Sequence, residues 1–219
     1  MKAKRTFSFF FSLLVVLSMA QETEIADKPK WKYEPNFMVG FDILNAGLSF
    51  FSERKVYQGF VSSRLNRELH VVADAGFERN IYVKNGYDGE VKGPFVKLGT
   101  LYRLMKDPEN RLNGFYVGGK LAASFYKQEY RAVPVRGFGG SSSFEEFPSS
   151  GQSSYWIEGA AGGRVQLFDS NFYIDVNIQP KYLIYTTKQE DIQPMIVPGF
   201  GKSSGKFNMG YMWNIAYSF

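Results

Sequence analysis

The single histidine of the sequence, His70, is the first residue that could act as a general base. Ser62 and Ser63 lie on the preceding segment, across a short turn, and a serine beside a histidine can become a nucleophile. Such a pair would suit a lipid-modifying enzyme whose substrate comes from the inner leaflet. No motif supports the pairing, however, and we favour the alternative that His70 is a polar residue hydrogen-bonded to a neighbour. We therefore assign no catalytic residue.

The sequence lacks the residues that a disulfide, a lipid anchor, a nucleotide site or a typical metal site would need. The chain contains no cysteine, which removes disulfides, a lipoprotein anchor and the softest metal ligand. No phosphate-binding loop, dinucleotide fingerprint or metal-ligand spacing is present, so we expect no metal and no cofactor. The glycine-rich stretch 137–140 is not followed by a helical pattern, and it fits a flexible loop better than a phosphate site.

Charged residues are the second group that could do chemistry, because they recur on the polar face of alternating segments. Six are basic and five are acidic, which favours an interlocked network of ion pairs, since an unpaired buried charge is costly. The alternative is a narrow ion path along the same residues. The charges are Asp42, Arg64, Asp74, Glu78, Lys97, Arg103, Lys120, Glu158, Arg164, Asp175 and Lys181.

Eight segments alternate between apolar and polar residues and must position these charges. Most exceed the usual 5–6 residues of a soluble strand and match the 9–11 residues of a tilted membrane strand. We place the segments at residues 36–44, 55–65, 68–79, 94–105, 113–127, 154–168, 171–187 and 206–219. An even number of strands returns both ends of a barrel to the same side, which would be the periplasm.

The connections between these segments alternate in length. The short ones are 66–67, 106–112 and 169–170, and the long ones are 45–54, 80–93, 132–153 and 188–205. Tight turns at one rim and long loops at the other are typical of outer-membrane barrels. A chain of this kind presents its long loops to the outside of the cell.

Aromatic residues indicate which face of the strands points outward. A soluble barrel would bury its apolar face, but here aromatics stand near both ends of the apolar face, as in the two interfacial belts of membrane barrels. The predicted belts are Phe37, Phe115, Phe172, Tyr217 and Phe219 at the short-turn rim, and Tyr57, Phe77, Phe95, Phe125, Tyr155 and Phe207 at the other. An eight-stranded barrel is only wide enough to be filled by its own side chains. We predict an all-β fold, an eight-stranded antiparallel transmembrane β-barrel with a filled polar lumen.

The N-terminal residues read as a secretion signal. Lys2, Lys4 and Arg5 precede an apolar run, and Ser18-Met19-Ala20 is a small-x-small cleavage site. We expect a signal peptide at 1–20, a periplasmic lead-in at 21–35 and the barrel at 36–219. The signal peptide holds three basic residues and no acidic one, which leaves a net charge of +2 from the +5 of the whole chain. This small excess does not indicate nucleic-acid binding.

Two of the long loops contain apolar side chains that could contact a ligand. They are Phe138, Phe144, Phe147, Met195 and Phe200. Exposed apolar residues at a cell surface often mark contact sites. The alternative is that these residues fold over the barrel mouth and cover it.

Three features together resemble one class of proteins: the signal peptide, Asp74-Ala75-Gly76-Phe77-Glu78, and the alternating C-terminal segment that ends at Phe219. The chain resembles small outer-membrane β-barrel proteins of Bacteroidota-type bacteria, and the nearest family is one of uncharacterised function. The resemblance implies Phe219 as an assembly signal, with outer-membrane lipid and the barrel-assembly machinery as partners and the outer membrane as location. We expect a non-enzymatic protein that acts through its loops on a surface ligand or an envelope protein.

Overall fold

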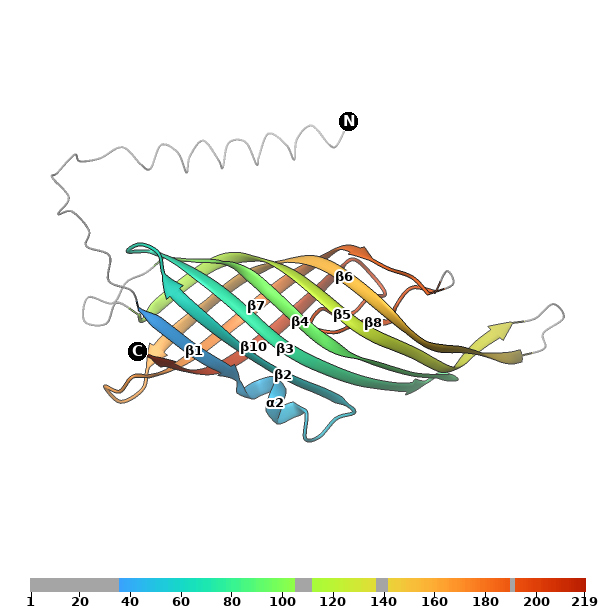
Figure 1. The fold of residues 1–219 in the computed structure, drawn as a ribbon. Helices are drawn as coiled ribbons and strands as arrows, with labels where there is room; N and C mark the ends of the chain where they lie inside the picture. Colours follow the sequence, from blue (N-terminus) through green and yellow to red (C-terminus); the bar gives the residue numbers. More distant parts are fainter. Residues whose placement is uncertain (1–35, 105–111, 137–141, 190–191) are drawn as a thin grey trace, which may run out of the picture. The chain divides into compact units, whose positions relative to one another are not determined.

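A computed structural model describes residues 36–104, 112–136, 142–189 and 192–219 of the chain. The predicted signal peptide, the predicted lead-in and Phe138 lie outside the described residues. Eight strands form a closed antiparallel barrel in the order β1-β10-β7-β6-β5-β4-β3-β2 (Figure 1). This closure confirms the predicted all-β, eight-stranded barrel. Among the described residues, no helix has both the length and the hydrophobicity of a membrane span.

The strand boundaries agree with the prediction at the short-turn rim and differ at the other. The barrel strands are β1 (Phe37–Asp42), β2 (Arg54–Arg64), β3 (Leu69–Lys84), β4 (Tyr87–Arg103), β5 (Gly114–Arg136), β6 (Ser142–Gln166), β7 (Phe172–Thr186) and β10 (Phe207–Ser218). A short helix, α2 (Ile43–Leu48), follows β1. A small hairpin of β8 (Ile196–Val197) and β9 (Gly201–Lys202) lies between β7 and β10.

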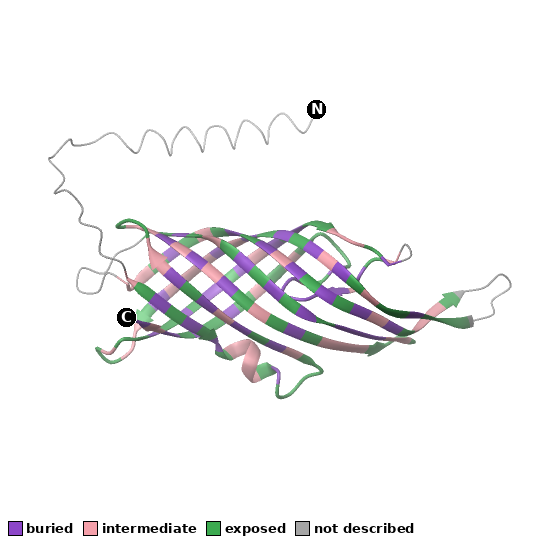
Figure 2. Cartoon of the chain, in the orientation of Figure 1, coloured by how far each residue is buried: buried purple, intermediate pink, exposed green. Residues whose placement is uncertain are grey.

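Buried and exposed residues alternate along the wall of the barrel (Figure 2). In β10, Met212, Asn214 and Ala216 are buried, whereas Tyr211, Trp213 and Ile215 are exposed. The apolar face therefore points outward, as predicted. Because side chains in a strand alternate, a one-residue shift would have placed the charges outside.

One residue of the predicted aromatic belts is on the wrong face. Phe95 is only 1% exposed, whereas the other predicted residues at that rim, such as Phe77 and Phe125, are exposed. Phe95 precedes Lys97 by two positions, so the two side chains share the inner face. Gly76, directly opposite Phe95 on β3, provides the room for its ring.

Two of the predicted long loops are mostly strand. The predicted connection 80–93 is a continuation of β3 and β4, joined by a turn at Asn85 and Gly86, which have φ angles of 56° and 82°. Two successive positive φ angles form the hairpin turn that Asn-Gly favours. Residues 132–136 and 142–153 likewise extend β5 and β6. Alternation fails to mark the extension 142–153 because it carries polar residues on both faces.

The predicted connection 188–205 folds into the barrel. Its central part, residues 194–203, is called the plug loop below. Ile196, Val197 and Phe200 in this loop are buried, and the ring of Phe200 meets that of Trp156 edge to face at 5.9 Å between centroids. The loop thus occupies the interior at the rim opposite the short turns.

The interior is filled in three layers. At the long-connection rim, an upper apolar cluster contains Val56, Val91, Phe95, Ala122, Tyr126, Trp156, Leu183, Val197 and Phe200. Near the short turns, a lower apolar cluster contains Met38, Phe60, Val72, Leu101, Tyr116, Ala160, Tyr173 and Ala216. Charged residues such as Lys97, Lys120 and Glu158 stand between the two clusters along their strands. These three residues form a polar layer between two apolar layers, whereas Arg103 lies on the short-turn side of the lower cluster and Arg164 packs over the rings of Phe60 and Tyr116.

Candidate functional site

The barrel wall has a gap where its first strand stops early. β1 pairs with β10 only as far as Asp42 opposite Asn214, and with β2 only as far as Phe41 opposite Gly59. Residues 207–213 of β10 and 54–58 of β2 continue past these points without β1 between them. This space between the two strand edges is called the wall gap below.

Helix α2 fills the wall gap because the chain is turned at the end of β1. The Asp42 side chain accepts hydrogen bonds from the Asn45 backbone nitrogen at 3.2 Å and from Asn45 Nδ2 at 2.6 Å, which caps the helix. Figure 1 shows α2 beside the end of β1 and the start of β2. The chain thereby leaves the sheet at Asp42 and re-enters it at Arg54.

Two polar side chains of this segment replace part of the missing strand. Asn45 Nδ2 donates to the Tyr211 carbonyl oxygen at 3.1 Å, on the free edge of β10. The Val56 backbone nitrogen, on the free edge of β2, donates to Ser49 Oγ at 2.7 Å. An unpaired strand edge is otherwise a row of unsatisfied polar groups. The gap is therefore closed by side chains at single points rather than by a ladder of backbone bonds.

A cavity of about 440 Å³ lies behind the wall gap. It is bounded by α2, by the free edges of β2 and β10, and by the plug loop. Its polar lining residues are Asn45, Arg54, Gln58, Asn80, Tyr82, Gln179, Lys181, Lys202, Asn208 and Tyr211. Among the described residues, the lining thus contains three basic residues, five amides and no carboxylate.

The carboxylates nearest the cavity are already engaged by cations. Glu78 accepts from Arg54 Nε at 2.7 Å and from the Gly199 backbone nitrogen at 2.8 Å. Glu158 lies 3.1 Å from Lys97 Nζ and 3.5 Å from Lys181 Nζ. Asp42 is a third carboxylate close by, since it accepts from Asn45 and acts on Arg54. The four cations Arg54, Lys97, Lys181 and Lys202 thus face three carboxylates, and the remaining positive charge favours a negatively charged ligand.

The plug loop is fixed at the wall of the cavity by groups from four strands. Lys181 Nζ donates to the Gly199 carbonyl oxygen at 2.6 Å, and Asn208 Nδ2 donates to that of Phe200 at 3.0 Å. The Met195 backbone nitrogen donates to the Tyr130 hydroxyl at 3.1 Å. Gly199 has a φ of +78° and lies against the ring of Phe95, so a side chain there would be strained in both respects.

The predicted interior charges form separate small groups rather than one network: two pairs, and a triad in which Glu158 lies between Lys97 and Lys181. Ten of them are buried, and Arg64 is half-buried. Lys120 Nζ lies 2.5 Å from Asp74 Oδ2, and Arg164 Nη2 lies 2.8 Å from Asp175 Oδ2. Asp42 instead caps α2. Sequence reasoning missed Arg54 and Lys202 because each stands at a strand boundary.

His70 is buried near the short-turn rim, and its partner is a cation. Arg103 Nη2 lies 2.8 Å from His70 Nε2, and since a guanidinium can only donate, this ring nitrogen is the acceptor. Ser62 and Ser63 lie opposite Val72 and Val71, whereas Arg64 is the residue opposite His70. A ring nitrogen that already accepts from an arginine is not placed to take a proton from a serine.

The predicted loop contacts separate into exposed and buried residues. Phe144 is 64% exposed, on the extension of β6, and Met195 is half-buried. Phe147 is buried opposite Tyr130, and Phe200 is buried in the plug loop. Phe147 and Phe200 therefore fit the alternative that loop residues fold over the barrel mouth, because they are buried instead of facing solvent.

Phe219 lies at the seam of the barrel. Its side chain is exposed, its backbone nitrogen donates to the Phe37 carbonyl oxygen at 2.9 Å, and its ring meets that of Tyr217 edge to face. The residue thus adds one backbone bond to the pairing of β1 with β10.

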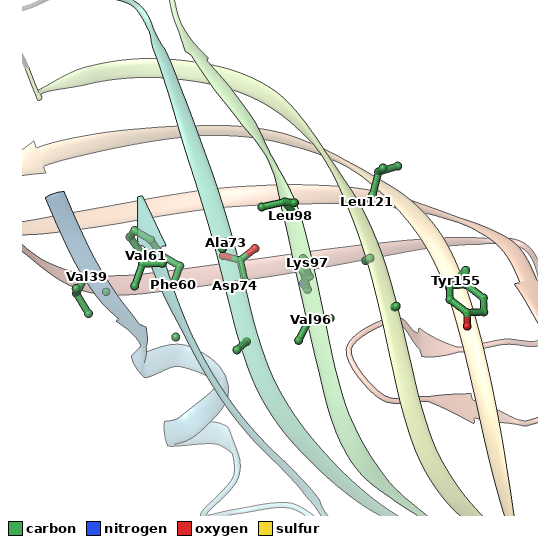
Figure 3. A pocket seen from close by; sticks show the side chains of 15 residues that line it. Val39, Phe60, Val61, Ala73, Asp74, Val96, Lys97, Leu98, Leu121 and Tyr155 are labelled. Carbon is green, nitrogen blue, oxygen red and sulfur yellow. The ribbon is translucent and has the colours of Figure 1, made fainter. Parts of the chain in front are cut away.

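A second hollow, of about 660 Å³, lies on the outside of the wall. Figure 3 shows its lining side chains spread over adjacent strands from β1 to β6. Small residues such as Gly59, Ala73 and Ala123 form its floor, and Leu98, Leu121 and Tyr155 stand beside them. This surface is almost wholly apolar, so it lacks the polar groups that would orient a ligand. Among the residues that the structure describes, no three His, Asp or Glu side chains are grouped so as to hold a metal ion.

Comparison with solved structures finds other small barrels. Neisserial surface protein A is 14% identical to the chain, with a TM-score of 0.44, over 84% of this chain and 96% of that one. Ail, the attachment invasion locus protein of Yersinia pestis, is 15% identical with a TM-score of 0.44, over 86% of this chain and 100% of that one. A structure of Ail with the heparin analogue sucrose octasulfate is 14% identical with a TM-score of 0.43, over 84% and 97%.

No curated protein matches the sequence. One family does match, over residues 2–219, and its description is "Domain of unknown function (DUF6048)". Because the match spans almost the whole length, the chain belongs to the DUF6048 family.

Proposed function

We propose that this chain is a non-enzymatic outer-membrane barrel that binds a small anionic ligand in the cavity behind the wall gap. The observation that carries the proposal is the composition of that cavity, whose described lining presents Arg54, Lys181 and Lys202 and several amides but no carboxylate. Such a set suits a ligand that combines a phosphate, sulfate or carboxylate with hydroxyl groups, as a sugar phosphate does.

The location in the outer membrane is supported by the outer surface of the barrel. Exposed apolar residues such as Leu98, Leu121 and Ile174 cover its middle, and exposed aromatics such as Phe77 and Phe172 stand towards its ends. This is the pattern of a wall solvated by lipid, flanked by side chains that prefer the interface. Outer-membrane lipid and the assembly machinery are accordingly its proposed general partners.

Binding would use cations that retain some freedom to turn. The Arg54 side chain is 44% exposed although it pairs with Glu78, and Lys202 is exposed. Lys202 can reach an anion without leaving a carboxylate buried alone, whereas Arg54 must contact the anion while it keeps its bond to the buried Glu78. Lys181 is held by Gly199 and Glu158 and would act as a fixed donor at the bottom of the cavity. Hydrogen bonds to charged groups contribute about 1.5–3 kcal/mol each.

The experiment is a binding titration on the folded barrel in detergent, with glucose 6-phosphate and glucose as a matched pair. We expect the phosphorylated sugar to bind at least tenfold more tightly than glucose, and Arg54→Gln with Lys202→Gln to remove most of that difference. Lys127→Gln is the control, because Lys127 is exposed and does not line the cavity. Equal affinity for glucose 6-phosphate and glucose would refute a basic binding site. Unchanged affinity of the double variant for glucose 6-phosphate would refute it too.

A separate measurement tests the location. The expressed protein should fractionate with the outer membrane and should migrate differently on a gel before and after heating. Recovery in the soluble periplasmic fraction would contradict the proposal, whatever the result of the titration.

A further inference from the structure

We propose that the anionic ligand is a lipid, which reaches the cavity sideways through the wall gap. Its phosphate-bearing headgroup would lie among Arg54, Lys181 and Lys202, and its acyl chains would remain outside, against α2 and β10. This inference rests on the proposed function and adds the source of the anion, which is the membrane rather than the surrounding water.

The first observation is the height of the wall gap. In β10 the segment without a β1 partner ends at Trp213, five positions before Ser218 at the short-turn rim. With the rise and tilt usual for barrel strands, residues 208–213 lie about 13–26 Å from that rim. The gap therefore occupies the half of the apolar band next to the long connections, which corresponds to the outer leaflet when the short turns face the periplasm.

The second observation is that the cavity touches both faces of the same strand. Met212 of β10 points inward and is buried, whereas Met209 and Tyr211 point outward and are 40% and 58% exposed. All three line the cavity, together with Leu48 of α2. Because this part of β10 has no β1 partner, the cavity meets the strand at its free edge, beside α2.

The third observation is the change in polarity across the wall. The inner side of the gap carries the cations and amides of the cavity. Its outer side carries exposed apolar residues, with Leu48 at 56%, Phe50 at 77% and Phe51 at 91%. A water-soluble anion would make no favourable contact with this apolar outer surface. An amphiphile with a charged head and apolar chains matches both sides at once.

The fourth observation is how lightly the gap is closed. The segment 43–49 meets the free edge of β10 through Asn45 of α2 and that of β2 through Ser49, the C-cap of the helix. Moving it aside would break these side-chain bonds, whereas separating two paired strands of the wall would break a whole ladder. The segment can therefore move aside and open the wall gap, where no ladder of backbone hydrogen bonds joins β10 to β2.

The test compares three probes by native mass spectrometry of the barrel released from detergent: phosphatidic acid, glycerol 3-phosphate and diacylglycerol. Phosphatidic acid carries both the anion and the acyl chains, and each of the others carries one of them. We expect phosphatidic acid to be retained at least tenfold better than either. Arg54→Gln with Lys202→Gln should lower binding of both phosphates.

Two matched variants of the outer wall separate the lipid from the free anion. Leu48→Asn places a polar group at the outer rim of the gap and should reduce retention of phosphatidic acid several-fold, with no change for glycerol 3-phosphate. Leu98→Asn makes the same change at the outer hollow, far along the sheet, and should alter neither. Met209→Asn replaces Leu48→Asn if the latter lacks the heat-dependent migration of a folded barrel.

The outcomes distinguish this inference from the proposed function. Equal affinity for phosphatidic acid and glycerol 3-phosphate, insensitive to Leu48→Asn and to Met209→Asn, would overturn the lipid and leave the anion site standing. Retention of phosphatidic acid that does not respond to loss of Arg54 and Lys202 would mean lipid held nonspecifically around the barrel, which also overturns it. No binding of either phosphate would refute the proposed function itself.

Discussion

Glu158 is the residue on which the charged layer of the interior depends most. Its carboxylate lies within ion-pair distance of Lys97 and Lys181 and accepts a hydrogen bond from Trp156 Nε1 at 2.7 Å. All four side chains are buried. One negative charge thus offsets two positive ones in a region that water reaches poorly, and its removal would leave both lysines without a counterion.

We expect Glu158→Gln to destabilise the folded barrel by about 3–5 kcal/mol, the usual cost of breaking a buried ion pair. Glutamine keeps the shape and one acceptor for Trp156, so the loss reports the charge rather than a cavity. The measurement is the urea midpoint of the barrel in lipid vesicles. Glu145→Gln, at an exposed position of β6, is the control and should leave the midpoint unchanged. An equal midpoint for both variants would mean that water or ions screen the layer.

At this scale the sequence predicts positions better than partners. Alternation places Lys97 and Glu158 on the inner face, and both are there. Their contact spans β4 to β6, and it depends on strand tilt and on side-chain length, neither of which periodicity contains. Phe95 is a different case, because alternation with Lys97 places it on the inner face and only its aromatic type suggested an outer belt.

The element that periodicity did not predict is α2. The predicted first strand continues to residue 44 because Ile43 and Leu44 extend its apolar pattern, whereas the strand ends at Asp42. The local signal is the cap, since Asp42 stands three residues before Asn45 and accepts from its backbone nitrogen. The Asn85-Gly86 turn is a similar local signal, and it predicts a hairpin where length alone suggests a loop.

Ser49 is the point at which α2 protects the free edge of β2. Its hydroxyl accepts from the Val56 backbone nitrogen at 2.7 Å and lies 3.3 Å from the Val56 carbonyl oxygen. Ser49→Ala should leave a buried backbone group without a partner, at a cost of about 1–3 kcal/mol. We expect faster amide hydrogen exchange in residues 54–58, with no change in β5 or β7.

Ser143→Ala, at an exposed position far from the gap, is the control for that measurement. If Ser49→Ala leaves exchange at 54–58 at its original rate, the edge is protected by lipid or by the sheet itself, and α2 is not what closes it. Slower amide exchange throughout β2 and β10 in Ser49→Ala would likewise mean that α2 is not what closes this edge.

For the whole molecule, the three layers decide whether the barrel can conduct. The predicted interior charges allow a narrow ion path, but two apolar clusters separate the central charges Lys97, Lys120 and Glu158 from the two rims. An ion crossing the upper cluster would lose its water among apolar side chains, and in the lower cluster the Arg164–Asp175 pair already occupies the space beside Tyr116. The layering depends both on which inward positions are aromatic and on the register of the strands, so periodicity alone does not predict it.

We expect no steady current from the wild-type barrel in a planar bilayer. Replacing the plug loop, residues 194–203, by a short Gly-Ser linker removes Val197 and Phe200 from the upper cluster but leaves the lower cluster intact, so this variant should not conduct either. Adding Phe60→Ala and Tyr116→Ala to the same variant opens the lower cluster, and only this combination should pass ions. Phe60→Ala with Tyr116→Ala in the wild-type chain is the matched control, because its upper cluster remains. Steady conductance of the wild-type protein would revive the narrow ion path, and conductance of the plug-loop variant alone would make that loop the single seal.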